Sequence, residues 1–178
     1  TNDRQQSIVI GQDNGLYVVN GEHLSPLNEA CNYQVKDAKK TAAREAQIRA
    51  LIGLRKAYAS LIDSERTGGA AAESNRKKLN ALYASFVQAH GAINESDGLN
   101  ILKKVRDPFY PSLAALEVKG ATGYRPAMIL SRPTMRAAKA LSEPTIEDAF
   151  VLARNKSMSL DMEALAKDAK VTVSEATK

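Results

Sequence analysis

Two segments decide the fold: residues 34–64, QVKDAKKTAAREAQIRALIGLRKAYASLIDS, and residues 72–89, AESNRKKLNALYASFVQA. In the first segment, apolar residues recur at the three- and four-residue steps of an amphipathic helix, namely Ile48, Leu51, Ile52, Ala59 and Ile62. The second segment carries a similar stripe, formed by Leu79, Leu82, Tyr83, Phe86 and Val87. Gly68 and Gly69 separate the segments, and Gly91 is a stop signal after the second. The sequence therefore predicts an antiparallel helical hairpin as the core of the fold.

The residues before the hairpin have β-strand character. Ile8–Ile10 and Leu16–Val19 are β-branched or aromatic runs separated by the turn-forming residues 13–15. Asn20 and Gly21 supply the positive φ angles of a type I′ turn. These signals predict a small antiparallel meander. Because so short a hairpin is only marginally stable in water, we expect it to pack against the rest of the chain.

The residues after the hairpin are less regular. Residues 98–106 predict a short helix, residues 107–111 a turn, and residues 112–118 one or two helical turns. The apolar run 127–131, flanked by Pro126 and Pro133, predicts a strand.

Two more helices are predicted toward the C-terminal end. Thr145 caps one that runs through Arg154, and a second begins at Ser159 or Asp161 and runs through Lys170. With a further helix cap at Ser174, this region resembles the first half of a helix-turn-helix. The predicted fold class is α+β and predominantly α-helical. We divide it into a β-meander (1–30), a helical hairpin core (31–120), and a strand with C-terminal helices (121–178), together forming one compact domain of a longer protein.

Composition excludes several classes of protein. The chain has 178 residues and a formal charge of +5, with no apolar run long enough to span a bilayer and no signal-peptide pattern. The single cysteine, Cys31, fits a reducing compartment, so we predict a cytoplasmic protein that does not bind membranes. Two histidines leave little for a metal cluster, and we predict no metal ligands. Neither GxxxxGK[ST] nor GxGxxG occurs, so we predict no cofactor in this chain.

One short motif invites a catalytic interpretation. Asp107-Pro108-Phe109-Tyr110 is similar to the Asp/Asn-Pro-Pro-aromatic tetrapeptide with which amino-methyltransferases hold a flipped base. Phe109 replaces the second proline, and no glycine-rich cofactor loop accompanies the motif. We therefore interpret it as a proline turn capped by Asp107, with Tyr110 packed inward, and predict no catalytic residues.

A basic helix face is the candidate binding surface. Residues 36–56 carry seven cations and two acids, and three more cations open the second helix. The candidates for contact with the DNA backbone are Lys36, Lys39, Lys40, Arg44, Arg49, Arg55, Lys56, Arg76, Lys77 and Lys78. A solvated charged face is the alternative interpretation.

Several strings together resemble a segment of very large proteins encoded by phages, plasmids and integrated mobile elements. The matching residues are 79–83, 86–87, 90–94, 107–108, 110–111, 113–117, 147–149 and 160–161. Those proteins join an adenine-type DNA methyltransferase to a helicase of the Swi/Snf type, and some resemble phage anti-restriction proteins. The resemblance implies an intracellular parent protein that uses S-adenosylmethionine and ATP. No position here matches the family's catalytic motifs.

The resemblance and the residues together predict a non-catalytic accessory or connector segment, with double-stranded DNA and the flanking domains of the parent chain as partners. A protein-interaction scaffold that docks the flanking catalytic domains without binding DNA is the alternative. A third hypothesis is an unfamiliar enzyme whose carboxylates include Glu117, Asp148 and Asp161.

Overall fold

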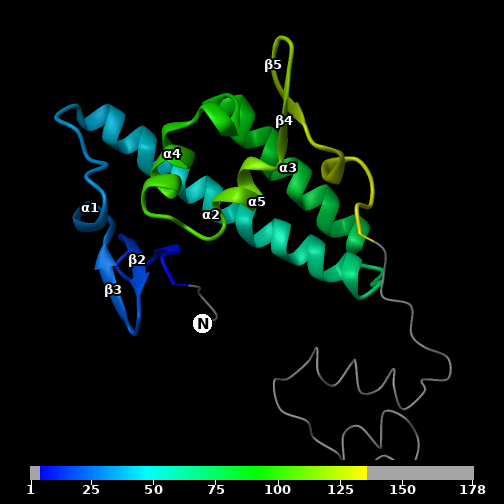
Figure 1. Ribbon diagram of the computed structural model, residues 1–178, viewed down its shortest axis with the longest axis horizontal. Coiled ribbons are helices and arrows are strands. Elements are labelled where there is room, and N and C mark those ends of the chain that lie inside the picture. Colours follow the sequence, from blue (N-terminus) through cyan, green and yellow to red (C-terminus); the bar gives the residue numbers. More distant parts are fainter. Residues whose placement is uncertain (1–4, 136–178) are drawn as a thin grey trace, which may run out of the picture. The chain divides into compact units, whose positions relative to one another are not determined.

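The computed structural model describes residues 5–135, all of which lie in the compact unit Thr1–Ala137. A three-stranded antiparallel sheet precedes a long helix pair, and short helices and a two-stranded sheet follow (Figure 1). The predicted α+β class with predominant helix is thus confirmed. The helices predicted between Thr145 and Lys170 lie outside the described residues.

The N-terminal sheet consists of β1 (Ile8–Ile10), β2 (Leu16–Asn20) and β3 (His23–Pro26), in the order β1-β2-β3. Ile8 pairs with Val18, and their side chains are buried on one face of the sheet. Gly21 forms the turn between β2 and β3 with a φ of 63°, a conformation that glycine adopts without strain. The predicted meander is confirmed, with an additional third strand, and α1 (Leu27–Ala30) follows it.

The helical hairpin consists of α2 (Ala38–Arg66) and α3 (Ala72–His90). Asp37 caps α2 by accepting hydrogen bonds from the backbone N–H groups of Lys39 and Lys40. Gly68, with a φ of 68°, lies in the connection between the helices. The fully buried side chains of the two helices form the centre of the core, among them Ile48, Leu51, Leu54, Leu61, Leu79 and Phe86.

Two short helices pack beside the hairpin. These are α4 (Asp97–Lys104), capped by Ser96, and α5 (Tyr110–Ala114). A Cβ atom on Gly98 would lie 2.8 Å from Cβ of Gln47, so α4 approaches α2 at a distance that only glycine allows. A 3₁₀ turn, η1 (Ile93–Glu95), connects α3 to α4.

The predicted strand at 127–131 is wrong. The structure instead has a hairpin of β4 (Glu117–Gly120) and β5 (Gly123–Pro126), and the apolar run forms a 3₁₀ turn, η2 (Met128–Leu130). The turn buries Ile129 and Leu130 beside α3, where the Asn80 side chain donates to the Leu130 carbonyl. The helical turns predicted over 112–118 also end early, at Ala114. The reason is that Glu117 begins strand β4 of the β4–β5 hairpin.

Candidate functional site

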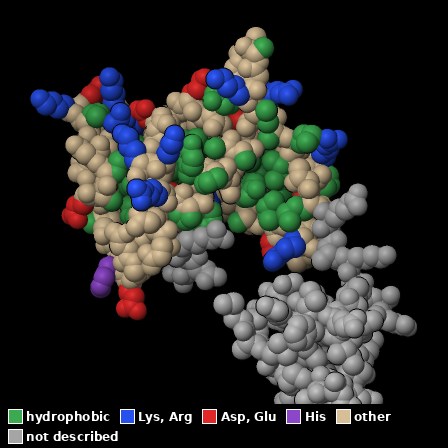
Figure 2. All heavy atoms as spheres, in the orientation of Figure 1, with side chains coloured by type: hydrophobic (Ala, Val, Ile, Leu, Met, Phe, Trp, Pro, Cys, Tyr) green, Lys and Arg blue, Asp and Glu red, His purple; other side chains and the backbone are tan. Residues whose placement is uncertain are grey.

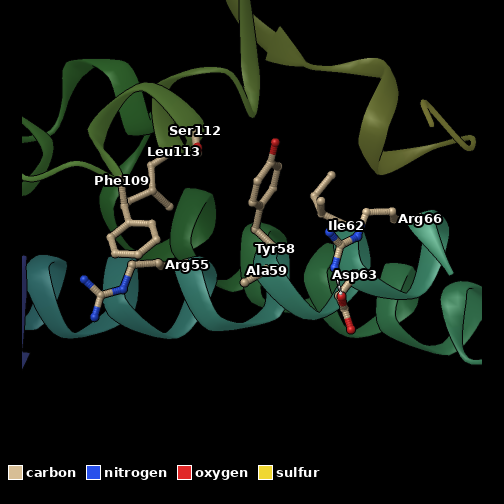
Figure 3. A pocket seen from close by; sticks show the side chains of 9 residues that line it. All are labelled: Arg55, Tyr58, Ala59, Ile62, Asp63, Arg66, Phe109, Ser112 and Leu113. Atoms are coloured by element: carbon tan, nitrogen blue, oxygen red, sulfur yellow. Dashed lines mark hydrogen bonds and ion pairs between the residues drawn. The ribbon is translucent and has the colours of Figure 1, made fainter. Parts of the chain in front are cut away.

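A groove of about 300 Å³ lies between α2 and α5. One wall is a stripe along α2, formed by Arg55, Tyr58, Ala59, Ile62, Asp63 and Arg66. The other wall comes from the start of α5 and consists of Phe109, Ser112 and Leu113. In Figure 3, Tyr58 and Ile62 project from the same side of α2, while Phe109 lies over Arg55 at one end. We call this cavity the α2–α5 groove.

The groove exists because α2 is much longer than its neighbour. The lining positions of α2 recur every three or four residues, so they form one face of the helix. Other faces of α2 pack against α3 and α4. Because α5 has only five residues, it covers just one end of the stripe and leaves Ile62 half-exposed.

A buried ion pair supports the covered end of the groove. Arg55 Nη1 lies 3.7 Å from Asp107 Oδ2, and the Arg55 guanidinium lies 4.5 Å from the centre of the Phe109 ring. Asp107 also accepts hydrogen bonds of 2.8 Å from the backbone N–H groups of Ile8 and Phe109. Desolvation raises the pKa of Asp107. The two N–H donors and Arg55 lower it by a smaller amount, so the pKa lies above its usual value. The Asp107 turn therefore joins the sheet to the helices, and the expectation of a capped turn is confirmed.

A second buried carboxylate closes the helical hairpin near the open end of the groove. Glu65 pairs with Arg76 and accepts hydrogen bonds from the backbone N–H groups of Thr134 and Met135. Arg76 also reaches the exposed Glu73. Desolvation acts to raise the pKa of Glu65, but the two backbone donors and Arg76 outweigh it and hold the pKa below its usual range.

A third buried carboxylate, Glu117, fixes the turn after α3. It accepts from the backbone N–H groups of Ile93 and Asn94, from the Asn94 side chain, and from the Tyr83 hydroxyl at 3.2 Å. Burial, and then the Glu117 charge and hydrogen bond, raise the pKa of Tyr83 to about 12. These donors satisfy the Glu117 carboxylate within the fold. Among the described residues, no second carboxylate contacts it.

We expect Tyr83→Phe to flatten the loss of stability at alkaline pH. An unfolded tyrosine titrates near pH 10, whereas folded Tyr83 keeps its proton to about pH 12. Its contribution to stability is therefore complete below about pH 10 and disappears as the pH rises toward 12. Urea unfolding of both proteins at about pH 8 and pH 11 measures the effect. Equal pH slopes in the two proteins would contradict the assignment.

The structure corrects two of the ten predicted DNA-contact residues. Arg55 and Arg76 are only 7% and 4% exposed, and both are held in ion pairs inside the protein. They therefore cannot present a guanidinium to a phosphate at the surface. Helical spacing placed them on a cationic face, but it could not reveal that carboxylates distant in sequence, such as Asp107, lie opposite.

Two further candidates are engaged at the surface. Arg44 pairs with Asp97 at 2.8 Å and donates to the Tyr33 carbonyl. Arg49 binds the side chain and carbonyl of Asn14, a residue in the β1–β2 turn with a φ of 64°. These two arginines attach the N-terminal part of the fold to α2 and α4.

The remaining six candidates are exposed lysines in three separate places. Lys36, Lys39 and Lys40 lie together at the start of α2, and none has an ion-pair partner within residues 5–135. Lys56 lies alone in the middle of α2. Lys77 and Lys78 belong to the start of α3, beside the other end of α2. Because the 29 residues of α2 span about 43 Å, the lysines do not form one patch.

The space-filling view separates two kinds of surface. In Figure 2, Lys and Arg side chains gather toward the end of the molecule where α2 begins, and hydrophobic side chains gather in the middle of the same face. Residues 5–135 contain 17 Lys and Arg against 12 Asp and Glu. This part of the chain thus accounts for an excess of five positive charges.

Other candidate groups have structural surroundings. His90 ends α3 and its ring meets Phe86 edge-on at 5.1 Å, while Cys31 is half-buried after α1. Within the described range there is no group of three His, Cys, Asp or Glu side chains placed to bind a metal. Of the carboxylates in the enzyme hypothesis, Glu117 is buried as described above, and Asp148 and Asp161 lie outside the described residues. No helix between residues 5 and 135 combines the length and apolarity needed to cross a membrane.

Comparison with protein-family models, with curated proteins and with solved structures finds no match to this chain. The resemblance to methyltransferase–helicase proteins therefore stays a prediction. The α2–α5 groove was not predicted from the sequence, although Ala59 and Ile62 were both recognised as members of the apolar stripe. Nothing in the helical pattern indicates that α5 leaves this part of the stripe open.

Proposed function

We propose that this chain is a non-catalytic accessory segment that docks other protein segments, within a cytoplasmic DNA-handling protein of the methyltransferase–helicase kind that it resembles. The observation that carries this proposal is the α2–α5 groove, where Tyr58, Ala59 and Ile62 lie on a face of the longest described helix that its neighbour covers only in part. A partly exposed apolar surface bordered by polar side chains is typical of interaction sites. Tyr58 and Arg66 belong to residue types that are enriched at protein interfaces.

The supports of the groove favour docking over catalysis. The buried groups beside it, Asp107 and Glu65, accept backbone hydrogen bonds and hold neighbouring segments in place. Their lone pairs are used by the fold itself, so they are not positioned as acids or bases facing a substrate. The groove therefore offers shape and apolar surface, which are the properties needed to bind another segment.

We expect an amphipathic helical peptide of about 15 residues, with a leucine stripe and an uncharged glutamine face, to bind in the groove. In ¹⁵N-labelled protein, the peptide should shift the amide resonances of Tyr58, Ile62 and Leu113. The exposed apolar residues Leu24 and Val118, which lie on the two sheets, serve as controls and should not shift. Shifts at the controls alone, or no shifts at millimolar peptide, would contradict the docking function.

Contact with the DNA backbone is a second candidate function, and the lysines at the start of α2 favour it. Lys36, Lys39 and Lys40 are exposed and lie within five residues of one another, with Lys36 just before α2 and the other two in its first turn. Three lysines that each neutralise one phosphate provide weak binding without sequence specificity.

For this second candidate we expect weak, salt-sensitive retention of a duplex of about 20 base pairs. Three phosphate contacts correspond to a slope of about −2.7 in a plot of log K against log salt, or about a 40-fold loss between 50 and 200 mM. Replacing Lys36, Lys39 and Lys40 by alanine should abolish this retention, whereas Lys77→Ala/Lys78→Ala should leave most of it. Equal losses of DNA retention in the triple and the double variant would disprove a localised site. If the wild type does not retain the duplex at low salt, DNA binding is wrong and docking is the one remaining candidate function.

A further inference from the structure

We infer that Asn14 is a site of covalent self-modification, at which the β1–β2 turn promotes conversion of the asparagine to aspartate and isoaspartate. In this reaction the backbone nitrogen of the next residue attacks the side-chain amide, ammonia leaves, and water opens the succinimide ring that results. Gly15 follows Asn14, and its nitrogen is open to this role because glycine carries no side chain. The inference is independent of the docking and DNA-binding functions proposed above.

Arg49 of α2 supports the reaction with two hydrogen bonds. Its Nη1 donates to Asn14 Oδ1 at 2.9 Å, which withdraws electrons from the amide carbon and stabilises the negative charge that forms on Oδ1 during attack. Its Nη2 donates to the Asn14 carbonyl oxygen. This carbonyl belongs to the same peptide group as the Gly15 nitrogen, so the positive charge also makes the Gly15 N–H more acidic. One guanidinium thus activates both the attacked carbon and the attacking nitrogen.

Asp13 provides the base. The Gly15 N–H donates to Asp13 Oδ1 at 3.0 Å, and the Tyr17 hydroxyl donates to Oδ2 at 2.6 Å. The bond from Tyr17, followed by the bond from Gly15, lowers the pKa of Asp13, so this carboxylate is charged at neutral pH. A charged acceptor beside the proton that must be lost is the arrangement of a general base. The leaving atom, Asn14 Nδ2, donates to no group of the described chain.

The atoms and charges of the reaction balance. The Gly15 nitrogen bonds to Cγ of Asn14 as its proton passes to the Asp13 carboxylate, and the electron pair of the C=O bond moves to Oδ1. The Cγ–Nδ2 bond then breaks, Nδ2 takes the proton from Asp13 and leaves as ammonia, and Oδ1 regains its double bond. Water adds to either carbonyl of the succinimide and yields aspartate or isoaspartate. Asp13 and Arg49 end the reaction unchanged.

The chain contains a matched comparison at Asn20 and Gly21, its other Asn-Gly pair. There the corresponding partners are neutral amides. The Gly21 N–H donates to the Gln5 side chain at 2.8 Å, and Asn20 Oδ1 accepts from the Gln6 side chain at 3.1 Å. Asn20 Nδ2 is also held, since it donates to Ser25 Oγ at 2.9 Å. Asn20 therefore has neither the charged base nor the cation that Asn14 has.

Peptide mass spectrometry after incubation near neutral pH tests this inference on the 178-residue chain. Trypsin releases residues 5–36 as one peptide, so fragment spectra report on both asparagines of the same molecule. We expect aspartate and isoaspartate to accumulate about fivefold faster at Asn14 than at Asn20. In concentrated urea the two sites should react at similar rates, because the contacts that distinguish them are lost.

Two variants separate the effect of the charges from the mobility of the turn. Arg49→Gln and Asp13→Asn each keep a side chain that forms hydrogen bonds but remove its charge. Each should slow the reaction at Asn14 several-fold and leave the rate at Asn20 unchanged. Arg66→Gln makes the same substitution at the other end of α2 and should change neither rate. Far-UV circular dichroism confirms that the variants fold.

Three results would overturn the inference. Equal rates at the two asparagines of the folded protein, or a faster reaction at Asn20, would show that the turn does not promote the reaction. A faster reaction at Asn14 in Arg49→Gln would show that Arg49 protects the asparagine. Unchanged rates at Asn14 in both charge-removing variants would show that neither group takes part. Because no peptide or duplex is used, these results do not bear on the proposed function, which has its own tests.

Discussion

Asp107→Ala is expected to lower the free energy of unfolding by about 2–5 kcal/mol. The Asp107 side chain is fully buried and accepts from the backbone N–H groups of Ile8 and Phe109, whose hydrogen bonds the substitution removes. It also removes the carboxylate that faces Arg55 inside the protein. Because Ile8 belongs to β1 and Phe109 to the wall of the α2–α5 groove, the loss should loosen both.

Urea unfolding at neutral pH, followed by circular dichroism, measures this prediction. Asp97→Ala is a matched control, because Asp97 also pairs with an arginine but its side chain is 56% exposed, and it should cost at most about 1 kcal/mol. Asp107→Asn should fall between the two, since burial raises the pKa of Asp107 and thus already disfavours its charged form. If Asp107→Ala and Asp97→Ala cost the same, the buried turn does not carry the stability assigned to it.

Glu65→Ala is expected to lower the free energy of unfolding by about 3–5 kcal/mol. Arg76 is 4% exposed and would keep only Glu73 as an ion-pair partner within the described chain. The backbone N–H groups of Thr134 and Met135 would lose their acceptor as well. This carboxylate holds the residues after η2 against the end of the helical hairpin, so its removal should release them.

Glu73→Ala is the control for this prediction, because Glu73 pairs with the same arginine from an exposed position. It should cost at most about 1 kcal/mol, and hydrogen exchange at Thr134 and Met135 should increase only in Glu65→Ala. The pKa of Glu65 lies below its usual range, so its contribution to stability is present near neutral pH and is lost as the pH falls through that lowered pKa. Glu65→Gln should therefore be less sensitive to acid than the wild type. Similar costs for Glu65→Ala and Glu73→Ala would contradict a buried role for Glu65.

Much of the secondary structure follows from local sequence patterns. The meander, the helical hairpin and a short helix, predicted at 98–106 and found at 97–104, follow from turn residues and apolar periodicity, because these signals act between residues close in the chain. The apolar run 127–131 was misassigned because a short apolar run does not distinguish a strand from a turn that packs against a helix. In the structure, α3 provides that packing partner through Asn80 and the turn.

The sequence by itself determined a predominantly helical α+β chain with a cationic long helix. Tertiary structure decided which of those cations remain at the surface, since Arg55 and Arg76 are neutralised by Asp107 and Glu65, across 52 and 11 residues of chain respectively. It also decided that α5 leaves part of the α2 stripe open as a groove. The physical reason is that burial and ion pairing depend on which segments meet in three dimensions, whereas periodicity reports only which residues share one face of one helix.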